Sequence, residues 1–284
     1  MDNNSADDTP AVMEELVARS SQVLVLTEMR KGAHFARNTG GRAAKGEILY
    51  FTDDDMLADK RLLEKIVEPF SIGAGVGSAS GRIIPAWETE PPVWVLEHCR
   101  NELLSLNDLG VATIISDTDP GVFSCHQAVS REAFFLAGGF NPDTNAGELV
   151  GDNETGLNIK IRDLGYRFAY VGQSVIRHVI PESRMSQRYL NSRFADQGFC
   201  DSYTAYRRRV PGAARLSLAM LRNAAMILPH SVAAGVRAAT GNSSWRLNVA
   251  RLFYLRNRVV YDFRLVRSRR WRRFALRSDW LTDD

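Results

Sequence analysis

Three consecutive carboxylates, Asp53, Asp54 and Asp55, directly follow the apolar run Ile48–Phe51. Like charges in a row repel one another, so this triplet is unfavourable unless a cation or solvent intervenes. Carboxylate oxygens at the end of a buried strand suit Mg²⁺ or Mn²⁺, which keep waters and bridge substrate phosphates. The alternative is an acidic, solvated turn, and the triplet does not decide between them.

A second acidic pair, Asp152 and Glu154, lies in the stretch GDNET just before a predicted helix. Acidic residues near a helix N-terminus are often ordinary caps, so a structural role competes with a catalytic one. His178 follows an apolar strand-like run, where a lone histidine is more often packed than a ligand. Each signal is weak by itself.

The elements that position these residues alternate between strand and helix as far as about residue 180. Val23–Leu26 and Ile48–Phe51 predict buried strands, and residues 31–47 and Arg61–Phe70 predict helices. This alternation favours an α/β fold with a mostly parallel central sheet, in which ligands gather beyond the carboxyl ends of the strands. Residues 167–181 predict two short strands.

From about Tyr189 onward the sequence reads as helical, so we expect two regions. Residues 1–188 form the α/β domain in this prediction, and residues 189–284 form a helical, arginine-rich C-terminal region.

Composition gives broader limits. The chain has 284 residues, 45% hydrophobic and 24% charged, with a net charge of +3, so its overall charge does not point to nucleic acid. Its three cysteines are widely spaced, which fits a reducing compartment. Residues 1–20 lack the basic and apolar regions of a signal peptide. We therefore expect a cytoplasmic protein, peripheral at the inner face of the plasma membrane.

The expectation of membrane contact comes from the segment Arg251–Arg277, in which arginines and aromatic residues interleave and Asp262 is the sole acid. A charge run of this kind is often a solvated helix face. A basic helix with aromatic side chains also suits an anionic membrane surface, and both interpretations stay open.

Taken in order, three stretches resemble the family 2 glycosyltransferases of the GT-A fold. They are ARNTGGRAAKGEILYFTDDD, then GGF, then GDNETGLNIKIRDLGYRFAYVGQSVIRH. The resemblance covers about residues 2–186, and HVIPESR is similar to a subgroup of that family. The opening MDNNSADDTP looks like the end of the family's second strand, so we expect the preceding strand-helix-strand to be missing.

The resemblance implies an inverting transfer from a UDP-, GDP- or dTDP-sugar with Mg²⁺ or Mn²⁺ as cofactor. Glu154 would then be the catalytic base, with Asp152 as the second candidate, on the acceptor side. The metal would be held by Asp53, Asp55 and His178. Nucleotide contacts would come from five matching positions, Asp2, Arg37, Asn38, Asp53 and Asp54. His126 and Gln127 would lie in the acceptor-side loop, and Arg184 and Arg188 could meet phosphates.

Three functions remain open at this point. The first is an active enzyme of polysaccharide, cell-envelope or glycolipid synthesis, acting on a saccharide or lipid-linked acceptor. The second is a truncated or inactive homologue that serves as a binding or scaffolding subunit. The third is a nucleic-acid binder using the arginine-rich tail, which we do not expect because it leaves the acidic cluster unexplained.

Overall fold

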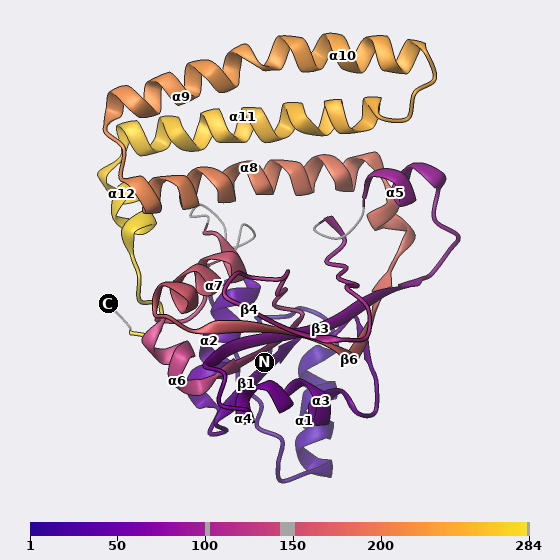
Figure 1. Ribbon diagram of the computed structural model, residues 1–284, viewed down its shortest axis with the longest axis vertical. Coiled ribbons are helices and arrows are strands. Elements are labelled where there is room, and N and C mark those ends of the chain that lie inside the picture. Colours follow the sequence, from indigo (N-terminus) through magenta and orange to yellow (C-terminus); the bar gives the residue numbers. More distant parts are fainter. Residues whose placement is uncertain (100–102, 143–150, 283–284) are drawn as a thin grey trace.

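The computed structural model describes residues 1–99, 103–142 and 151–282 (Figure 1). In these ranges the strands form one six-stranded sheet, in the order β1-β5-β3-β6-β2, with β4 also paired to β6. The strands are β1 (Ile48–Thr52), β2 (Met56–Ala58), β3 (Val76–Trp87), β4 (Thr113–Ser116), β5 (His126–Ser130) and β6 (Arg167–Ile180).

The two longest strands, β3 and β6, pair in parallel at the centre of the sheet. The pairs β1–β5, β3–β5, β2–β6 and β4–β6 are antiparallel. The predicted α/β architecture is thus confirmed. The parallel arrangement predicted for the sheet holds for its central pair, while the short strands around that pair make the sheet mixed.

Strand β6 corrects the prediction of two short strands. It runs through 14 residues, and a register shift interrupts its pairing with β3: Gly81 pairs with Val171, whereas Arg82 pairs with Val175. A bulge of this kind bends a strand without ending it. It places Ser174 against β3 at Gly81, where a Cβ would come within 2.2 Å of the Ser174 carbonyl oxygen, so only glycine fits.

Seven helices accompany the sheet in the described ranges. They are α1 (Thr9–Arg19), α2 (Ala33–Ala43), α3 (Leu62–Ile66), α4 (Glu68–Ser71), α5 (Val93–His98), α6 (Arg131–Leu136) and α7 (Asn153–Asp163). The helix predicted over Arg61–Phe70 is two short helices, because Pro69 opens α4 and its ring cannot continue α3.

The buried strand predicted at Val23–Leu26 is wrong. The backbone there pairs only at a bridge between Asp2 and Thr27, and Val23 and Leu24 are exposed. An apolar run becomes a buried strand only when neighbouring elements cover it, and a single paired residue does not do so.

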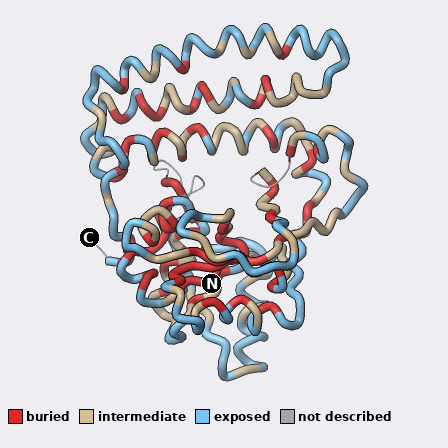
Figure 2. Tube along the Cα trace, viewed as in Figure 1, coloured by how far each residue is buried: buried red, intermediate tan, exposed pale blue. Residues whose placement is uncertain are grey.

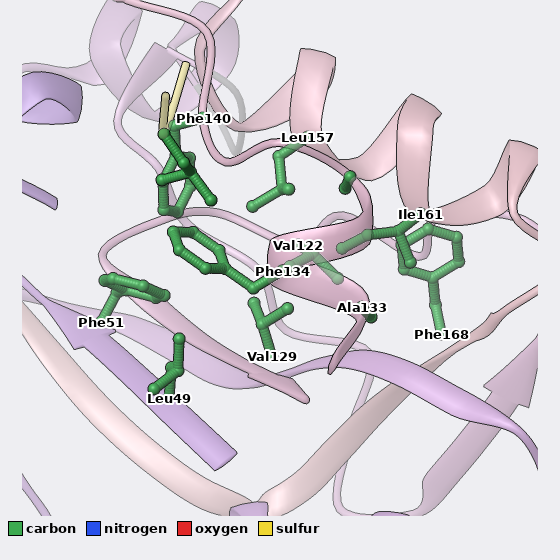
Figure 3. Packing of buried hydrophobic residues seen from close by; sticks show 12 residues of the cluster. Leu49, Phe51, Val122, Val129, Ala133, Phe134, Phe140, Leu157, Ile161 and Phe168 are labelled. Atoms are coloured by element: carbon green, nitrogen blue, oxygen red, sulfur yellow. The ribbon is translucent and has the colours of Figure 1, made fainter. Parts of the chain in front are cut away.

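The main apolar cluster lies between the sheet and the helices α6 and α7 (Figure 3). Phe51 of β1 contacts Phe134 of α6 and Phe140, with ring centroids 5.6 and 5.0 Å apart. Leu157 and Ile161 from α7 are fully buried in the same cluster. Burial of such side chains stabilises the fold by about 1.5–3 kcal/mol each. The packing fixes α7, and with it Glu154 in its first turn.

The C-terminal region is helical, as predicted. A 3-10 turn, η2 (Glu182–Met185), leads into α8 (Gln187–Arg209), α9 (Ala213–Ala225), α10 (Ile227–Ala239), α11 (Trp245–Arg267) and α12 (Arg269–Leu276). Figure 1 shows these helices as layers above the sheet: α8 nearest to it, then α11, and α9 with α10 outermost. The boundary at residue 188 stays a prediction.

The arginine-rich segment contributes much of its apolar surface to this helical region. Tyr261 and Phe274 are buried with Tyr203 of α8, and Trp271 packs against the same cluster. Trp280, just beyond α12, also joins the cluster, and its amide donates to the Gly138 carbonyl at 2.8 Å. These aromatic side chains therefore pack inside the protein and are not free to lie on a membrane. None of the described helices is long and apolar enough to cross a membrane.

Candidate active site

The carboxylate triplet lies where β1 ends and the chain turns toward β2. Asp53 accepts a hydrogen bond from the Arg37 guanidinium of α2, whose other Nη contacts His34 Nδ1 at 3.1 Å. Asp54 is exposed. The structure thus brings the predicted residues Asp53 and Arg37 together as an ion pair.

Asp55 and His178 also meet, as the antiparallel pairing of β2 with β6 requires. Asp55 Oδ2 lies 3.3 Å from His178 Nε2 and accepts from Arg184 at 2.9 Å. The Leu104 carbonyl lies 2.8 Å from His178 Nδ1, and Arg184 Nη1 lies 2.5 Å from Nε2. Because a carbonyl can only accept, Nδ1 carries a proton, and Nε2 lies between the Arg184 guanidinium and Asp55.

A divalent metal fits this pair as a partial site. Among the described residues no group of three or more histidine, cysteine or acidic side chains could hold a metal ion unaided. Asp55 Oδ1 is buried without a hydrogen-bond partner among the described residues. Asp55 Oδ2 and His178 Nε2 both contact Arg184, so a metal held by this pair would take the place of that guanidinium. Mg²⁺ commonly takes one or two protein ligands and completes its shell with water and substrate phosphates. Asp53, engaged by Arg37, is not drawn into this pair.

The charge state of Asp55 also suits a cation. Burial would raise the pKa of its carboxyl, but the contacts with His178 and Arg184 outweigh burial and hold the pKa below its usual value. Asp55 is thus ionised at neutral pH.

Glu154 stands in the first turn of α7 and faces α2. Its Oε2 lies 3.5 Å from His34 Nε2 and accepts from Ser124 Oγ at 3.5 Å. Burial would raise the pKa of Glu154, but His34 and then Arg37 lower it below its usual value. The preceding residue, Asn153, has φ of 55°, a left-handed conformation that asparagine tolerates and that is typical of functional sites.

His34 is a candidate site residue that the sequence did not reveal. It is buried on α2 and stacks on Phe140, with ring centroids 4.9 Å apart. Because Arg37 donates to its Nδ1, the proton lies on Nε2 and points at Glu154. The sequence does contain one indication of this contact: His34 lies three residues before Arg37, which places both residues on the same face of the helix.

Asp152, the second candidate base, has a different environment. Its Oδ2 accepts from Thr204 Oγ1 of α8 at 2.7 Å, and its Oδ1 accepts from Asn141. Burial raises the pKa of this carboxyl. With both oxygens bonded to neighbours, Asp152 ties α7 to α8 and is poorly placed to take a proton from an acceptor.

Two predicted nucleotide contacts are used inside the protein. The Asn38 side chain forms two hydrogen bonds with the Phe140 backbone, donating to its carbonyl at 3.0 Å and accepting from its amide at 2.8 Å. Asp2 is buried, and its side chain accepts from the Ser5 amide at 3.1 Å. The structure links neither side chain to Asp53 by a described contact.

His126 and Gln127 correct a sequence prediction. Both are fully buried in β5, not in an acceptor-side loop. His126 accepts from Tyr50 at 2.8 Å and donates to the Ser174 carbonyl at 3.2 Å, and burial lowers its pKa to about 4. Gln127 donates to Ser78 and Asn158. Neither side chain is available to a substrate.

Beside Glu154 a cavity of about 670 Å³ separates α7 from α8. Asp119, Asp152 and Glu154 lie on its sheet side. The α8 and α11 side carries both charges: the arginines Arg193, Arg208, Arg209 and Arg258, and the carboxylates Asp196 and Asp201. The cavity is large enough for a small saccharide or the head of a larger acceptor.

The mixed sheet, the carboxylates after β1 and the histidine near the end of β6 define a nucleotide-sugar transferase fold of the GT-A type. Residues 1–134 match the family model described as Glycosyl transferase family 2, which confirms the resemblance seen in the sequence over those residues.

Two curated relatives illustrate the match. Over 182 residues the chain is 23% identical to the glucosyl-dolichyl phosphate glucuronosyltransferase of Haloferax volcanii, covering 62% of this chain and 57% of that one. Over 67 residues it is 36% identical to the uncharacterized glycosyltransferase YfnE of Bacillus subtilis, covering 24% and 17% of the two chains. The chain thus spans little more than half of the first relative and much less of the second.

Among solved structures, the mannosyltransferase PcManGT from Pyrobaculum calidifontis has a TM-score of 0.57. Its identity to this chain is 20%, over 92% of this chain and 76% of that one. The match extends into the helical region and supports the fold of the whole chain.

Proposed function

We propose that this chain is an inverting, metal-dependent glycosyltransferase that moves a sugar from a UDP-, GDP- or dTDP-sugar to an acceptor hydroxyl. The observation that carries the proposal is a continuous line of contacts from Asp53 through Arg37 and His34 to Glu154. This line of contacts joins Asp53, after the end of β1, to the ionised carboxylate of Glu154 beside the cavity. The alternative of a scaffolding subunit gives no role to this line.

On the donor side, Asp55 and His178 would hold the metal, and Arg37 would keep Asp53 in place toward the donor. A bound divalent cation supplies electrostatic stabilisation of the departing diphosphate. The PcManGT structure was determined with GDP-Man and Mn²⁺, which supports a nucleotide sugar and a divalent metal here.

On the acceptor side, Glu154 takes the proton from the acceptor hydroxyl as its oxygen attacks the anomeric carbon. The bond between that carbon and the diphosphate oxygen breaks, and the nucleotide diphosphate leaves with the electron pair. Because attack and departure occur on opposite faces, the anomeric configuration inverts. His34 donates to Glu154 and keeps it ionised, which a general base requires.

The acceptor would occupy the cavity between α7 and α8, and we propose a saccharide or lipid-linked acceptor of polysaccharide, cell-envelope or glycolipid synthesis. Carboxylates and arginines both line this cavity, and such a polar wall suits the hydroxyl groups of a saccharide.

The test is turnover of a donor panel by the purified chain. The chain is incubated with Mn²⁺ and each of the UDP-, GDP- and dTDP-sugars, and one donor should be hydrolysed slowly. Proton NMR should show that the released sugar has the anomeric configuration opposite to that of the donor. Retention of configuration, or no cleavage of any donor by a folded chain, would contradict the proposal.

A further inference from the structure

The helices α9 and α10 carry a stripe of exposed apolar side chains on their outer side. Five of these side chains are between 57% and 71% exposed: Leu218, Leu221, Leu228, Val232 and Val236. At 100° per residue they fall within an arc of about 80° along the two consecutive helices. We call these five residues the outer stripe.

The outer stripe lies opposite the side by which the two helices pack on the protein. Leu216 and Asn223 of α9 and Ala234 of α10 are buried, and both helices pack on α11. In Figure 1 these two helices form the layer farthest from the sheet, and Figure 2 shows most of their length as exposed. The apolar side chains of the stripe are therefore not part of the helical core.

The charges around the stripe are all positive. Arg215 and Arg222 lie beside it on the helical wheel, Arg237 lies farther round, and all three are exposed. In the described part of the chain none of the three forms an ion pair. No aspartate or glutamate occurs from residue 202 to residue 261, so no acidic side chain lies on α9, α10 or the connections beside them.

We propose that the outer stripe lies in the headgroup region of an anionic lipid bilayer and holds the protein at a membrane surface. The stripe runs from Leu218 to Val236, about 27 Å of helix, and is not a pocket. A row of aliphatic side chains bordered on one side by arginines matches the interface of an anionic leaflet in both polarity and charge.

A protein partner fits this face less well. Protein interfaces favour aromatic anchors seated in pockets, and the outer stripe holds leucine and valine on a convex helix surface. The inference places the membrane-facing surface on α9 and α10, whereas the sequence suggested Arg251–Arg277. It does not depend on the proposed function, because membrane binding is measured without donor or acceptor.

The test is co-sedimentation of the full chain with vesicles of phosphatidylcholine containing 40% phosphatidylglycerol, against pure phosphatidylcholine. The wild type should bind the anionic vesicles and release them as salt rises. The double variant Leu221→Asp/Leu228→Asp should lose at least tenfold in partition coefficient. Arg215→Glu and Arg222→Glu should each lose about fivefold or more.

The control variant is Leu63→Asp, which makes the same change at a side chain 59% exposed on α3, far from the stripe. It should bind as the wild type does. Equal binding by the double variant, or no binding by a folded wild type, would overturn the proposal. So would a dimer in light scattering that the double variant dissociates, because the stripe would then be an interface between two copies.

Discussion

His34 Nε2 and Glu154 Oε2 lie 3.5 Å apart, and this contact joins the two halves of the candidate site. The other nitrogen of His34 contacts Arg37, which pairs with Asp53 at the end of β1. A residue on α2 thus sets both the protonation of the proposed base and its position relative to the donor side.

Replacing Glu154 by glutamine should remove the base while keeping the shape of the side chain. We expect kcat to fall by about 10²–10⁴-fold, with donor binding unchanged, because a general base contributes that much to the barrier. Steady-state kinetics and nucleotide titration measure the two quantities separately.

Asp152→Asn provides the matched comparison for this result. Since Asp152 is bonded to Thr204 and Asn141, its replacement should mainly lower stability and leave part of the activity in the folded fraction. A larger loss of kcat in Asp152→Asn than in Glu154→Gln, at equal folded fraction, would assign the base to Asp152.

Replacing His34 by phenylalanine should raise the pKa of Glu154, because burial then acts without the contact that opposes it. The base would be protonated at a higher pH, so the acid limb of the kcat/KM profile should move upward. His34→Gln keeps a donor near Oε2 and should move the limb less. An unchanged limb in both variants would show that His34 does not act through Glu154.

His126 should make the fold sensitive to acid. Its pKa is about 4 in the folded protein and 6.5 ordinarily, so between these values the unfolded chain binds more protons. Stability from this residue is therefore complete above pH 6.5 and decreases as pH falls toward 4, by about 3 kcal/mol in all.

The measurement is urea unfolding of the wild type and His126→Gln at pH 7 and pH 4.5. The variant should be less stable at pH 7, but its loss between the two pH values should be about 2–3 kcal/mol smaller than that of the wild type. Equal losses would mean that His126 is not the group that titrates.

The sequence predicted the site best where residues that can bind a metal lie directly beside a strand. The triplet after Ile48–Phe51 and the histidine of β6 were expected to meet, and Asp55 lies beside His178. It failed for Val23–Leu26, because an apolar run does not reveal whether other elements will cover it.

Long-range side-chain contacts account for most of the remaining differences. His34 and Glu154 are far apart in sequence, and only the packing of α7 over the sheet brings them together. The two short strands predicted in residues 167–181 are one strand, β6, with a bulge. That bulge depends on the pairing of β6 with its parallel partner β3. Trp271 and Phe274 of Arg251–Arg277 pack with aromatic residues of α8, and these partners were not evident in the sequence. Phe263 of the same segment is 47% exposed.

Thermal unfolding with Mn²⁺ and UDP, GDP or dTDP tests whether Asp55 holds a metal that binds the nucleotide, in the wild type, Asp55→Ala and Leu63→Asp. Ligands that bind only the folded state raise Tm. One nucleotide should raise the Tm of the wild type and of Leu63→Asp only when Mn²⁺ is present, and should leave that of Asp55→Ala unchanged. The same rise in Asp55→Ala, or no rise with any nucleotide in a wild type that unfolds cooperatively, would contradict the account.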